Sequence, residues 1–512
     1  MMFLKFLLAI LPIVWLIIAL SGLKMAGHKA CSITLIITVI MGMFYKKLSG
    51  LYVASAVLEG VLNALWPICL VIIAALFTYN LSLKTGAMEK IKKMLGNVSC
   101  DSRVLALIIG WGFGNFMEGM AGFGTAVAIP ASMLAGIGMN PINAVVGCLV
   151  VNTTPTAFGS VGVPTVTLSS ITGIDILPLC TDIALIQMLL TALSPFFIVC
   201  ICGQGLKSLK GMIPMTLVAS LSFVIPWYLT ASFIGAELPN IIGAIVSMAC
   251  MILAAKKIGP KKDPEYEIEI RQEEGEKITV KDGIVAWSPF ILIFILLMAV
   301  SDLCPPIHDF LAQFRSQVVV YAGEGGSTLT FSWINTPGVI IFIAAIIGGL
   351  IQKAKISEMI TVLLETLKAY WKTVLTICCV MSTAKILGYS GMISDIAQFL
   401  VVITGAAYPF VSPIIGVVGG FVTGSGTSTC VLFGALQKET AMSLGLDPTW
   451  IASANIMGAG IGKMICPQSI AIGAGAINAV GSESVILGRV FKYCLFYTIV
   501  AGIVCIAGAY LF

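Results

Sequence analysis

Long apolar runs follow one another along most of the 512-residue chain, with short polar segments between them. A helix needs roughly 20 apolar residues to cross the hydrocarbon core of a bilayer. Runs of this kind lie at 6–22, 31–45, 53–80, 184–203, 212–229, 239–255, 286–303, 336–352, 369–390 and 491–511. The pattern predicts an all-α polytopic membrane protein with about 12 to 14 transmembrane helices.

Two further stretches, 104–175 and 408–488, are apolar but interrupted by Gly, Pro, Ser, Thr and Asn. In lipid, backbone that leaves the helix survives only where protein or a water-filled cavity covers it. We therefore expect broken helices or re-entrant hairpins in both stretches, buried inside the protein. These stretches are the first candidates for a functional site.

The composition supports the membrane class. Hydrophobic residues make up 58% of the chain and charged residues 10%, whereas soluble globular proteins carry about 25% charged residues. This balance argues against a soluble enzyme, a secreted disulfide scaffold and a nucleic-acid-binding protein. Only two histidines occur, and the 15 cysteines lack metal-ligand spacing. We therefore expect no metal site and no cofactor.

The two interrupted stretches resemble each other. Gly122 and Asn152 are 30 residues apart in the first stretch, and Gly424 and Asn455 are 31 apart in the second. In both stretches a proline follows the asparagine by 12 residues, at Pro164 and Pro467. Markers in the same order at nearly the same spacing indicate an internal repeat.

Lysine and arginine predict the orientation of the repeats, because they concentrate in cytoplasmic loops. The run 369–390 is followed by 391–408, which contains no Lys or Arg and should lie outside. The corresponding run 53–80 is followed by Lys84, Lys90, Lys92, Lys93 and Arg103, which indicate a cytoplasmic end. Equivalent helices then run in opposite directions, and both termini are expected outside.

The sequence accordingly predicts two inverted-topology repeats, at 1–205 and 284–512. A linking two-helix unit at 206–255 and a polar cytoplasmic loop at 256–283 join them. Inverted repeats with interrupted helices are typical of secondary transporters, whose substrate site lies near the midplane of the membrane.

Glu118 is the most informative candidate, because a carboxylate in an apolar span costs roughly 2.5–3.5 kcal/mol on insertion scales. Such a residue needs a partner or a proton. Burial disfavours its charged form, so we expect Glu118 to carry a coupled proton. The alternative is a carboxylate that only accepts backbone hydrogen bonds at a hairpin tip.

Glycines cluster in both interrupted stretches and allow the backbone to turn or to approach a ligand closely. The expected hinges of this kind are Gly122, Gly124, Gly424 and Gly426. A half-helix that begins near Thr125 would direct free N–H groups at an anion. The candidates for the same role in the second stretch are Ser425, Thr427 and Ser428. Close helix packing is the alternative explanation for the glycines.

Prolines mark two further expected hinges, Pro155 and Pro467, because proline lacks the N–H of a helix interior. Polar side chains beside the prolines can bind hydroxyl or carboxylate groups. The substrate-binding candidates of this kind are Asn152, Thr153, Asn455, Gln468 and Ser469.

Lys463 is a cation in a glycine-rich apolar setting. We expect it to pair with a substrate carboxylate, or with Glu118 in the empty state. A lysine that extends to the membrane interface is the alternative. Glu59 and Lys385, near or within predicted spans, are interpreted as helix-border residues.

At these residues the chain resembles the lactate permease family, which includes glycolate permeases. The resemblance rests on EGMAGFGTAVAIPASMLAGIGMNPINAVVGCLVVNTTPTAFGSVGVP (118–164), TGSGTS (423–428) and ASANIMGAGIGKMICPQSIAIG (452–473). The matching positions are Glu118, Gly122, Gly124, Asn152, Thr153, Pro155, Lys463, Pro467, Gln468 and Ser469. The family usually has an acidic residue where this chain has Gly426, and an amide where it has Cys430.

The resemblance implies a symporter of the prokaryotic plasma membrane that takes up 2-hydroxymonocarboxylates such as L-lactate or glycolate with protons. The expected partners are therefore a small organic anion and the lipid bilayer, with no nucleic acid, and the oligomeric state stays open. A sodium-coupled carrier of another organic anion is the main alternative, and a passive channel is another. A membrane-embedded enzyme is disfavoured, because the interrupted stretches contain no histidine and no paired carboxylates.

Overall fold

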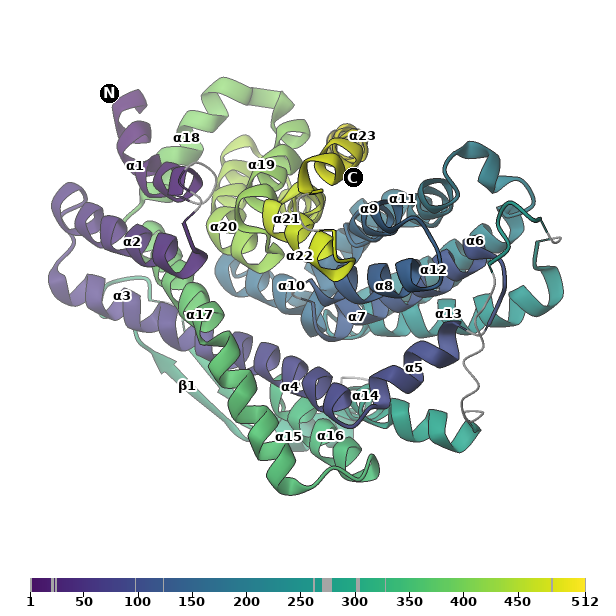
Figure 1. Ribbon diagram of the computed structural model, residues 1–512. Coiled ribbons are helices and arrows are strands. Elements are labelled where there is room, and N and C mark those ends of the chain that lie inside the picture. Colours follow the sequence, from purple (N-terminus) through teal and green to yellow (C-terminus); the bar gives the residue numbers. More distant parts are fainter. Residues whose placement is uncertain are drawn as a thin grey trace.

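The computed structural model consists almost entirely of helices packed side by side (Figure 1). Helices account for 82% of the residues that the structure describes, which confirms the all-α membrane class predicted from the sequence. The structure describes residues 2–19, 23, 25–96, 98–122, 124–260, 263–268, 279–300, 304–326, 328–479 and 482–511.

The elements are numbered along the chain, and the first interrupted stretch ends with α10. Up to that point they are α1 (Met2–Ile17), α2 (Gly27–Ile40), α3 (Gly50–Asn63), α4 (Leu70–Lys84), α5 (Ala87–Gly96), α6 (Ser102–Leu105), α7 (Gly114–Met120), α8 (Thr125–Gly136), α9 (Pro141–Val151) and α10 (Gly159–Thr172). The middle of the chain contains α11 (Ile176–Cys202), α12 (Ile213–Phe233), α13 (Pro239–Ile258), α14 (Val280–Val300), α15 (Pro305–Ala312), β1 (Arg315–Val319), β2 (Thr328–Ser332) and α16 (Pro337–Ile351).

The last part of the chain contains the second interrupted stretch. Its elements are α17 (Ile356–Tyr389), α18 (Met392–Thr404), α19 (Tyr408–Thr423), α20 (Gly426–Leu444), α21 (Pro448–Ile465), α22 (Pro467–Ala476) and α23 (Glu483–Leu511). Short π-helical segments lie at Met41–Tyr45, Ala64–Cys69 and Ala106–Phe113, and 3₁₀ turns at Thr154–Phe158, Leu206–Leu209 and Gly405–Ala407. The strands β1 and β2 pair antiparallel, with Arg315 opposite Ser332.

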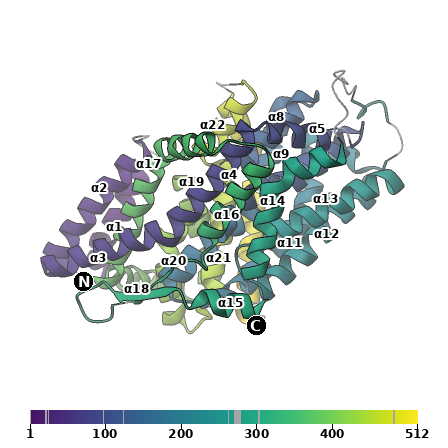
Figure 2. The same cartoon turned by 90° about the horizontal axis from the view of Figure 1, so that it is seen from below.

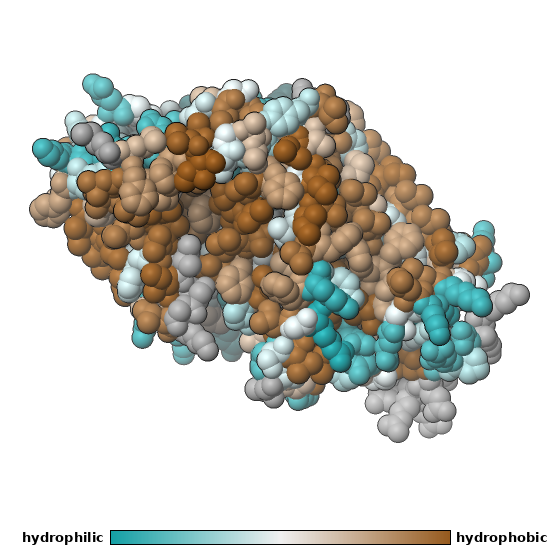
Figure 3. Space-filling view, turned by 90° about the horizontal axis from the view of Figure 1, so that it is seen from above, coloured by the Kyte–Doolittle hydropathy of each residue, from teal (hydrophilic) through white to brown (hydrophobic). Residues whose placement is uncertain are grey.

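The outer surface is that of a membrane protein, since Figure 3 shows a broad hydrophobic face with hydrophilic residues gathered at two opposite ends. By length and composition, the described residues contain 9 helices able to cross a membrane, or 10 if the bent pair α9–α10 forms one span. The sequence predicted more crossings. Three further apolar helices of the described residues, Met2–Leu16, Thr125–Gly136 and Pro337–Ile351, are shorter than these spans.

The predicted polar loop is partly docked rather than fully solvated. Helix α13 extends to Ile258 and α14 begins at Val280, inside the range predicted for the loop. Asp101 and Glu267 form an isolated β-bridge, and the guanidinium of Arg103 lies 4.0 Å from the ring centroid of Tyr266. Residues 263–268 are thereby held against the segment before α6. Residues 261–262 and 269–278 of the loop lie outside the described part of the chain.

Helices α3 and α17 cross in close contact, and Figures 1 and 2 show α17 passing across the α3–α4 pair. A Cβ atom added to Gly60 would lie 2.4 Å from the Cα atom of Ser382, so only glycine permits this approach. Trp66 interrupts the continuation of α3 into α4 with φ −130° and ψ 118°. Trp66 precedes a proline in the sequence, and the helical region is disfavoured for a residue in that position.

Helices α19 and α21 approach each other through glycines on both partners. A Cβ atom on Gly420 would lie 2.1 Å from the carbonyl oxygen of Ala459, and one on Gly462 would lie 2.0 Å from that of Val417. Small residues spaced in this way let helices pack backbone to backbone inside a membrane. The packing fixes α21, which carries Lys463 near its end.

Each interrupted stretch contains two pairs of helices, and in each pair a break separates the first helix from the second. The breaks fall between α7 and α8, between α9 and α10, between α19 and α20, and at Cys466 between α21 and α22. Figure 1 shows these helices together in the centre of the molecule. In Figure 2 both chain ends and α15 lie toward one side, and α8 and α22 toward the other. The inverted repeats and their boundaries stay a prediction.

Candidate functional site

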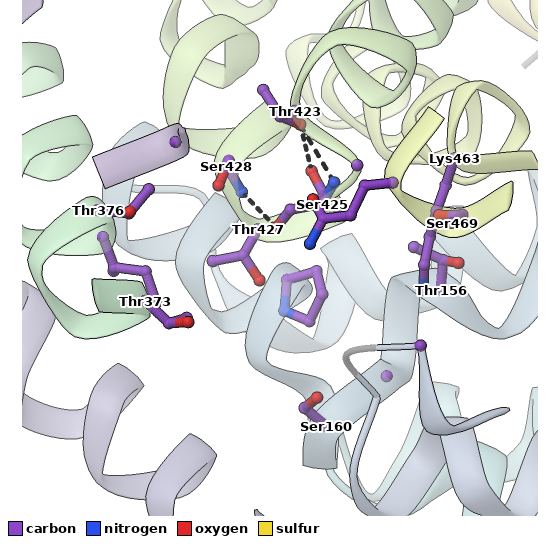
Figure 4. A pocket seen from close by; sticks show the side chains of 18 of the residues that line it. Thr156, Ser160, Thr373, Thr376, Thr423, Ser425, Thr427, Ser428, Lys463 and Ser469 are labelled. Carbon is purple, nitrogen blue, oxygen red and sulfur yellow. Dashed lines mark hydrogen bonds between the residues drawn. The ribbon is translucent and has the colours of Figure 1, made fainter. Parts of the chain in front are cut away.

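A cavity of about 280 Å³ lies where the broken helices meet. Figure 4 shows hydroxyl side chains of the segment 423–428 facing it, with Lys463 and Ser469 at one side. The predicted site residues that line the cavity are Glu118, Gly124, Gly424, Ser425, Gly426, Thr427, Ser428, Lys463, Gln468 and Ser469. Both stretches thus contribute to one polar cavity, although they are about 300 residues apart in the sequence.

A buried ion pair lies in the cavity wall. The Nζ atom of Lys463 donates a hydrogen bond of 2.6 Å to Oε1 of Glu118. Glu118 is 2% exposed and Lys463 is 8% exposed. Two charges in such a place are tolerated because each compensates the other and both have hydrogen-bond partners. The lysine does not extend to the membrane interface but faces the centre of the site.

The break between α9 and α10 holds the Glu118 carboxylate on its other side. Nδ2 of Asn152, at the end of α9, donates to Oε2 of Glu118 at 2.9 Å. Gly159 leaves room for the carboxylate, since a Cβ atom there would lie 2.8 Å from Oε1. Asn152 and Lys463 therefore fix the carboxylate between them.

The break between α9 and α10 bends the chain by 57°. Thr154–Phe158 forms a 3₁₀ turn, with Pro155 at its start. Ser160, Val161 and Gly162 follow with φ of 46°, 56° and 77°. A left-handed conformation at two non-glycine residues in succession is strained, and such strain concentrates at functional sites.

The breaks at α7–α8 and α19–α20 turn on glycine. Gly122 and Gly124 have φ of 60° and 87°, and Gly424 has φ of 65°, values that an L-residue adopts only at a cost. Gly124 also contacts α22, because a Cβ atom there would lie 2.9 Å from Ile472. Phe123, between the two glycines, lies outside the described residues.

Three helices begin at the cavity, which makes its electrostatics favourable for an anion. Gly124 precedes α8, Ser425 precedes α20, and Gln468 and Ser469 lie in the first turn of α22. The first amides of a helix have no partner within it, and its N-terminus carries a partial positive charge. Oγ of Ser425 accepts from the amide of Ser428 at 3.2 Å and so caps α20.

Gly426 departs from the family pattern at a place where space is limiting. A Cβ atom on Gly426 would lie 2.9 Å from Cγ2 of Thr156. Any side chain at this position would displace Thr156, which lines the cavity. Cys430, the second departure, is fully buried in α20.

The other predicted residues do not line the cavity in the described part of the chain. They are Gly122, Thr125, Asn152, Thr153, Pro155, Asn455 and Pro467. Several are engaged with their own surroundings: Oγ1 of Thr125 donates to the carbonyl of Gly122 at 2.7 Å, and Oδ1 of Asn455 accepts from Gln437 at 3.4 Å. These side chains support the frame of the site in this structure.

Sequence reasoning missed one whole wall of the cavity. Helices α2 and α17 contribute it, with Gly27, His28, Lys372, Thr373, Thr376 and Ile377. Thr156, Ser160 and Thr423 were also not among the predicted residues, although they line the cavity. Lys372 was an available signal, because it lies within the apolar run 369–390 and charges in spans mark functional sites.

Glu59 and Lys385 are not helix-border residues, contrary to the interpretation from the sequence. Glu59 is fully buried on α3, and its Oε1 lies 2.6 Å from Nζ of Lys385 on α17. The hydroxyl of Tyr389 donates to the same carboxylate at 2.8 Å. The sequence failed here because the partners come together only through the packing of α3 against α17.

Several known proteins are similar to this chain. The sequence model of the family described as L-lactate permease matches residues 5–512. An L-lactate permease of Streptococcus iniae is 42% identical over 451 residues, covering 87% of this chain and 93% of that protein. The glycolate permease GlcA of Escherichia coli K12 is 34% identical over 540 residues, covering 99% and 96%. The solved structure of the YdaH transporter of Alcanivorax borkumensis resembles the fold, with a TM-score of 0.50, 13% identity and coverage of 87% and 86%.

The protein crosses the plasma membrane several times and has a polar cavity between broken helices. It is similar along its length to permeases, and it is therefore a membrane transport protein and not an enzyme. The family match extends over nearly the whole sequence. The chain belongs to the L-lactate permease family.

Proposed function

We propose that this protein takes up a small 2-hydroxymonocarboxylate, such as L-lactate or glycolate, together with protons. The observation that carries the proposal is the buried Glu118–Lys463 pair in a cavity at which three helices begin. Relatives named as L-lactate and glycolate permeases support the substrate class. The transported ions are substrates, and no resident cofactor is proposed.

The positive groups around the cavity suit a monocarboxylate. Lys463 supplies one full charge, and the starts of α8, α20 and α22 supply partial positive charges. The hydroxyl groups of Thr427, Ser428 and Ser469 line the same space and can hydrogen-bond the 2-hydroxyl group of the substrate. The proposed site therefore recognises both ends of a 2-hydroxy acid.

Coupling follows from competition for Lys463. While Glu118 is ionised it neutralises the ammonium group at 2.6 Å, so the substrate carboxylate gains little by approaching. Protonation of Glu118 releases Lys463 for the substrate. By linkage, a bound anion then favours the protonated form of Glu118 to the same extent. One proton would accompany one monocarboxylate at this site.

Uptake into proteoliposomes under imposed ion gradients tests the proposal. A proton gradient should drive lactate or glycolate accumulation without sodium, and Glu118→Gln should abolish accumulation while leaving exchange of labelled for unlabelled substrate partly intact. Equal uphill uptake by the variant and the parent would remove Glu118 from the coupling role.

Sodium coupling with another organic anion is the second candidate, and one observation favours it. The Oδ1 atom of Asn115 and Oγ1 of Thr154 are buried beside the breaks without a hydrogen-bond partner among the described residues. Oxygen atoms at unwound helices can coordinate Na⁺. Accumulation driven by a sodium gradient alone, with the proton gradient collapsed, would favour this alternative.

The inverted orientation of the two repeats, with both termini outside, is part of the proposal. Figure 2 shows both chain ends toward one side, as expected if the two termini lie on the same face of the membrane. An epitope at each terminus should be accessible to antibody in cells whose cell wall or outer membrane has been removed and whose plasma membrane is intact. Accessibility only after the plasma membrane is permeabilised would show that the termini lie in the cytoplasm, opposite to the proposed orientation.

A further inference from the structure

We infer that Lys372 is a second anion-binding residue, which holds the substrate carboxylate across the cavity from Lys463 while Glu118 keeps Lys463 neutralised. The inference rests on the proposed function and adds an earlier position of the substrate in the same cavity. The ligand class is again a small monocarboxylate.

The first observation is the second wall of the cavity. Lys372, Thr373 and Thr376 line it from α17, and His28 lines it from α2. In Figure 4, Thr373 and Thr376 face the cavity from the side opposite Lys463 and Ser469, and the segment with Ser425 and Ser428 lies between them. Lys372 lines the cavity from the same helix as these threonines, so two lysines, Lys372 and Lys463, line the space in which an anion would bind.

The second observation is the difference in partners between the two lysines. Lys463 is paired with Glu118, whereas Lys372 forms no ion pair among the residues that the structure describes. Its Nζ atom lies 5.9 Å from the centroid of the Trp371 ring. A ring face attracts a cation without cancelling its charge. The uncompensated full charge of the cavity therefore comes from Lys372.

The order of events follows from these charges. With Glu118 ionised, the Glu118–Lys463 pair is neutral overall, and an incoming carboxylate is attracted to Lys372. A proton on Glu118 then frees Lys463, and the carboxylate can move to the buried side. During release the same two positions are occupied in reverse. Lys372 binds the anion before the coupling step and does not itself carry the proton.

Transport kinetics of the full-length protein in proteoliposomes test this role. Lys372→Gln should raise the KM for lactate about tenfold, the size of one lost charge-assisted hydrogen bond, with Vmax at saturating lactate within twofold of the parent. Lys372→Arg should restore the KM. Lys368→Gln is the matched control, because Lys368 lies one turn earlier on α17 and does not line the cavity.

A double variant separates this inference from the proposed function. In Glu118→Gln, Lys463 is released permanently, so adding Lys372→Gln should change the KM of lactate exchange less than twofold. An unchanged KM in Lys372→Gln, or an equal rise in Lys368→Gln, would overturn the role of Lys372. Failure of the proposed function would instead appear as undiminished uphill uptake by Glu118→Gln. Lys372→Met provides a second neutral variant if Lys372→Gln does not reconstitute.

Discussion

Two carboxylate–lysine pairs with buried carboxylates have nearly the same chemistry in this protein. In each, the ammonium group lies 2.6 Å from the carboxylate, in Glu118–Lys463 and in Glu59–Lys385. In each a third group donates to the same carboxylate, Asn152 at 2.9 Å and Tyr389 at 2.8 Å. Charge and hydrogen bonding alone therefore do not distinguish a transport site from a structural contact.

The backbone around the pairs differs. Glu118 and Lys463 lie between broken helices and border a cavity. Glu59 and Lys385 lie where two helices cross in close contact, and the ring of Tyr321 stacks on that of Tyr389 at 3.7 Å. A substrate has room at the first pair, whereas the second is closed by packing. We therefore propose that the Glu59–Lys385 pair positions α17. This helix also carries Lys372, Thr373 and Thr376, which line the cavity.

The largest predicted difference concerns coupling. Glu118→Gln should lower the lactate accumulation ratio to about 1, because without an exchangeable proton only equilibration remains. Glu59→Gln should leave the accumulation ratio within about twofold of the parent, measured per reconstituted protein. Loss of accumulation in both variants at normal protein levels would contradict the division of roles.

The sequence pointed to both residues of the first pair, with Glu118 as one of two expected partners of Lys463, and did not predict the second pair. Glu118 and Lys463 lie in glycine-rich apolar stretches whose breaks are visible as Gly and Pro, and breaks in lipid predict a cavity. Glu59 and Lys385 lie in unbroken helical patterns, and their contact depends on how α3 crosses α17. The position of Lys372 at the cavity depends on the same long-range packing. The local sequence pattern predicts where a helix ends, but it does not predict which other helix packs against it.

The next largest effect concerns stability. Lys385→Met alone should destabilise the folded protein by about 3–5 kcal/mol, because it leaves the Glu59 carboxylate buried without its cation. Adding Glu59→Gln should recover most of the loss and keep transport. Thermal unfolding in detergent, together with uptake assays, measures both.

The corresponding double variant at the site sharpens the comparison. Glu118→Gln with Lys463→Met should also recover stability, but its lactate accumulation should stay at background. Recovered accumulation would mean that this pair, too, only holds helices together.

A smaller effect is expected from two glycines beside the pairs. Gly159→Ala brings a Cβ atom to 2.8 Å from Oε1 of Glu118, so the carboxylate must shift and lactate uptake should fall about tenfold, the loss of one charge-assisted contact. Gly60→Ala meets the backbone of Ser382 and should cost up to about 3 kcal/mol of stability through overpacking. Unchanged stability of Gly60→Ala would show that α3 and α17 can separate without loss.

The most direct test of Glu118 as the proton carrier is the movement of protons with substrate. Lactate added to the outside of weakly buffered proteoliposomes without an imposed gradient should make the medium alkaline as protons enter with the anion. Glu59→Gln should give the same response and Glu118→Gln none, although Glu118→Gln still exchanges labelled lactate. Alkalinisation of equal size in Glu118→Gln would contradict the account.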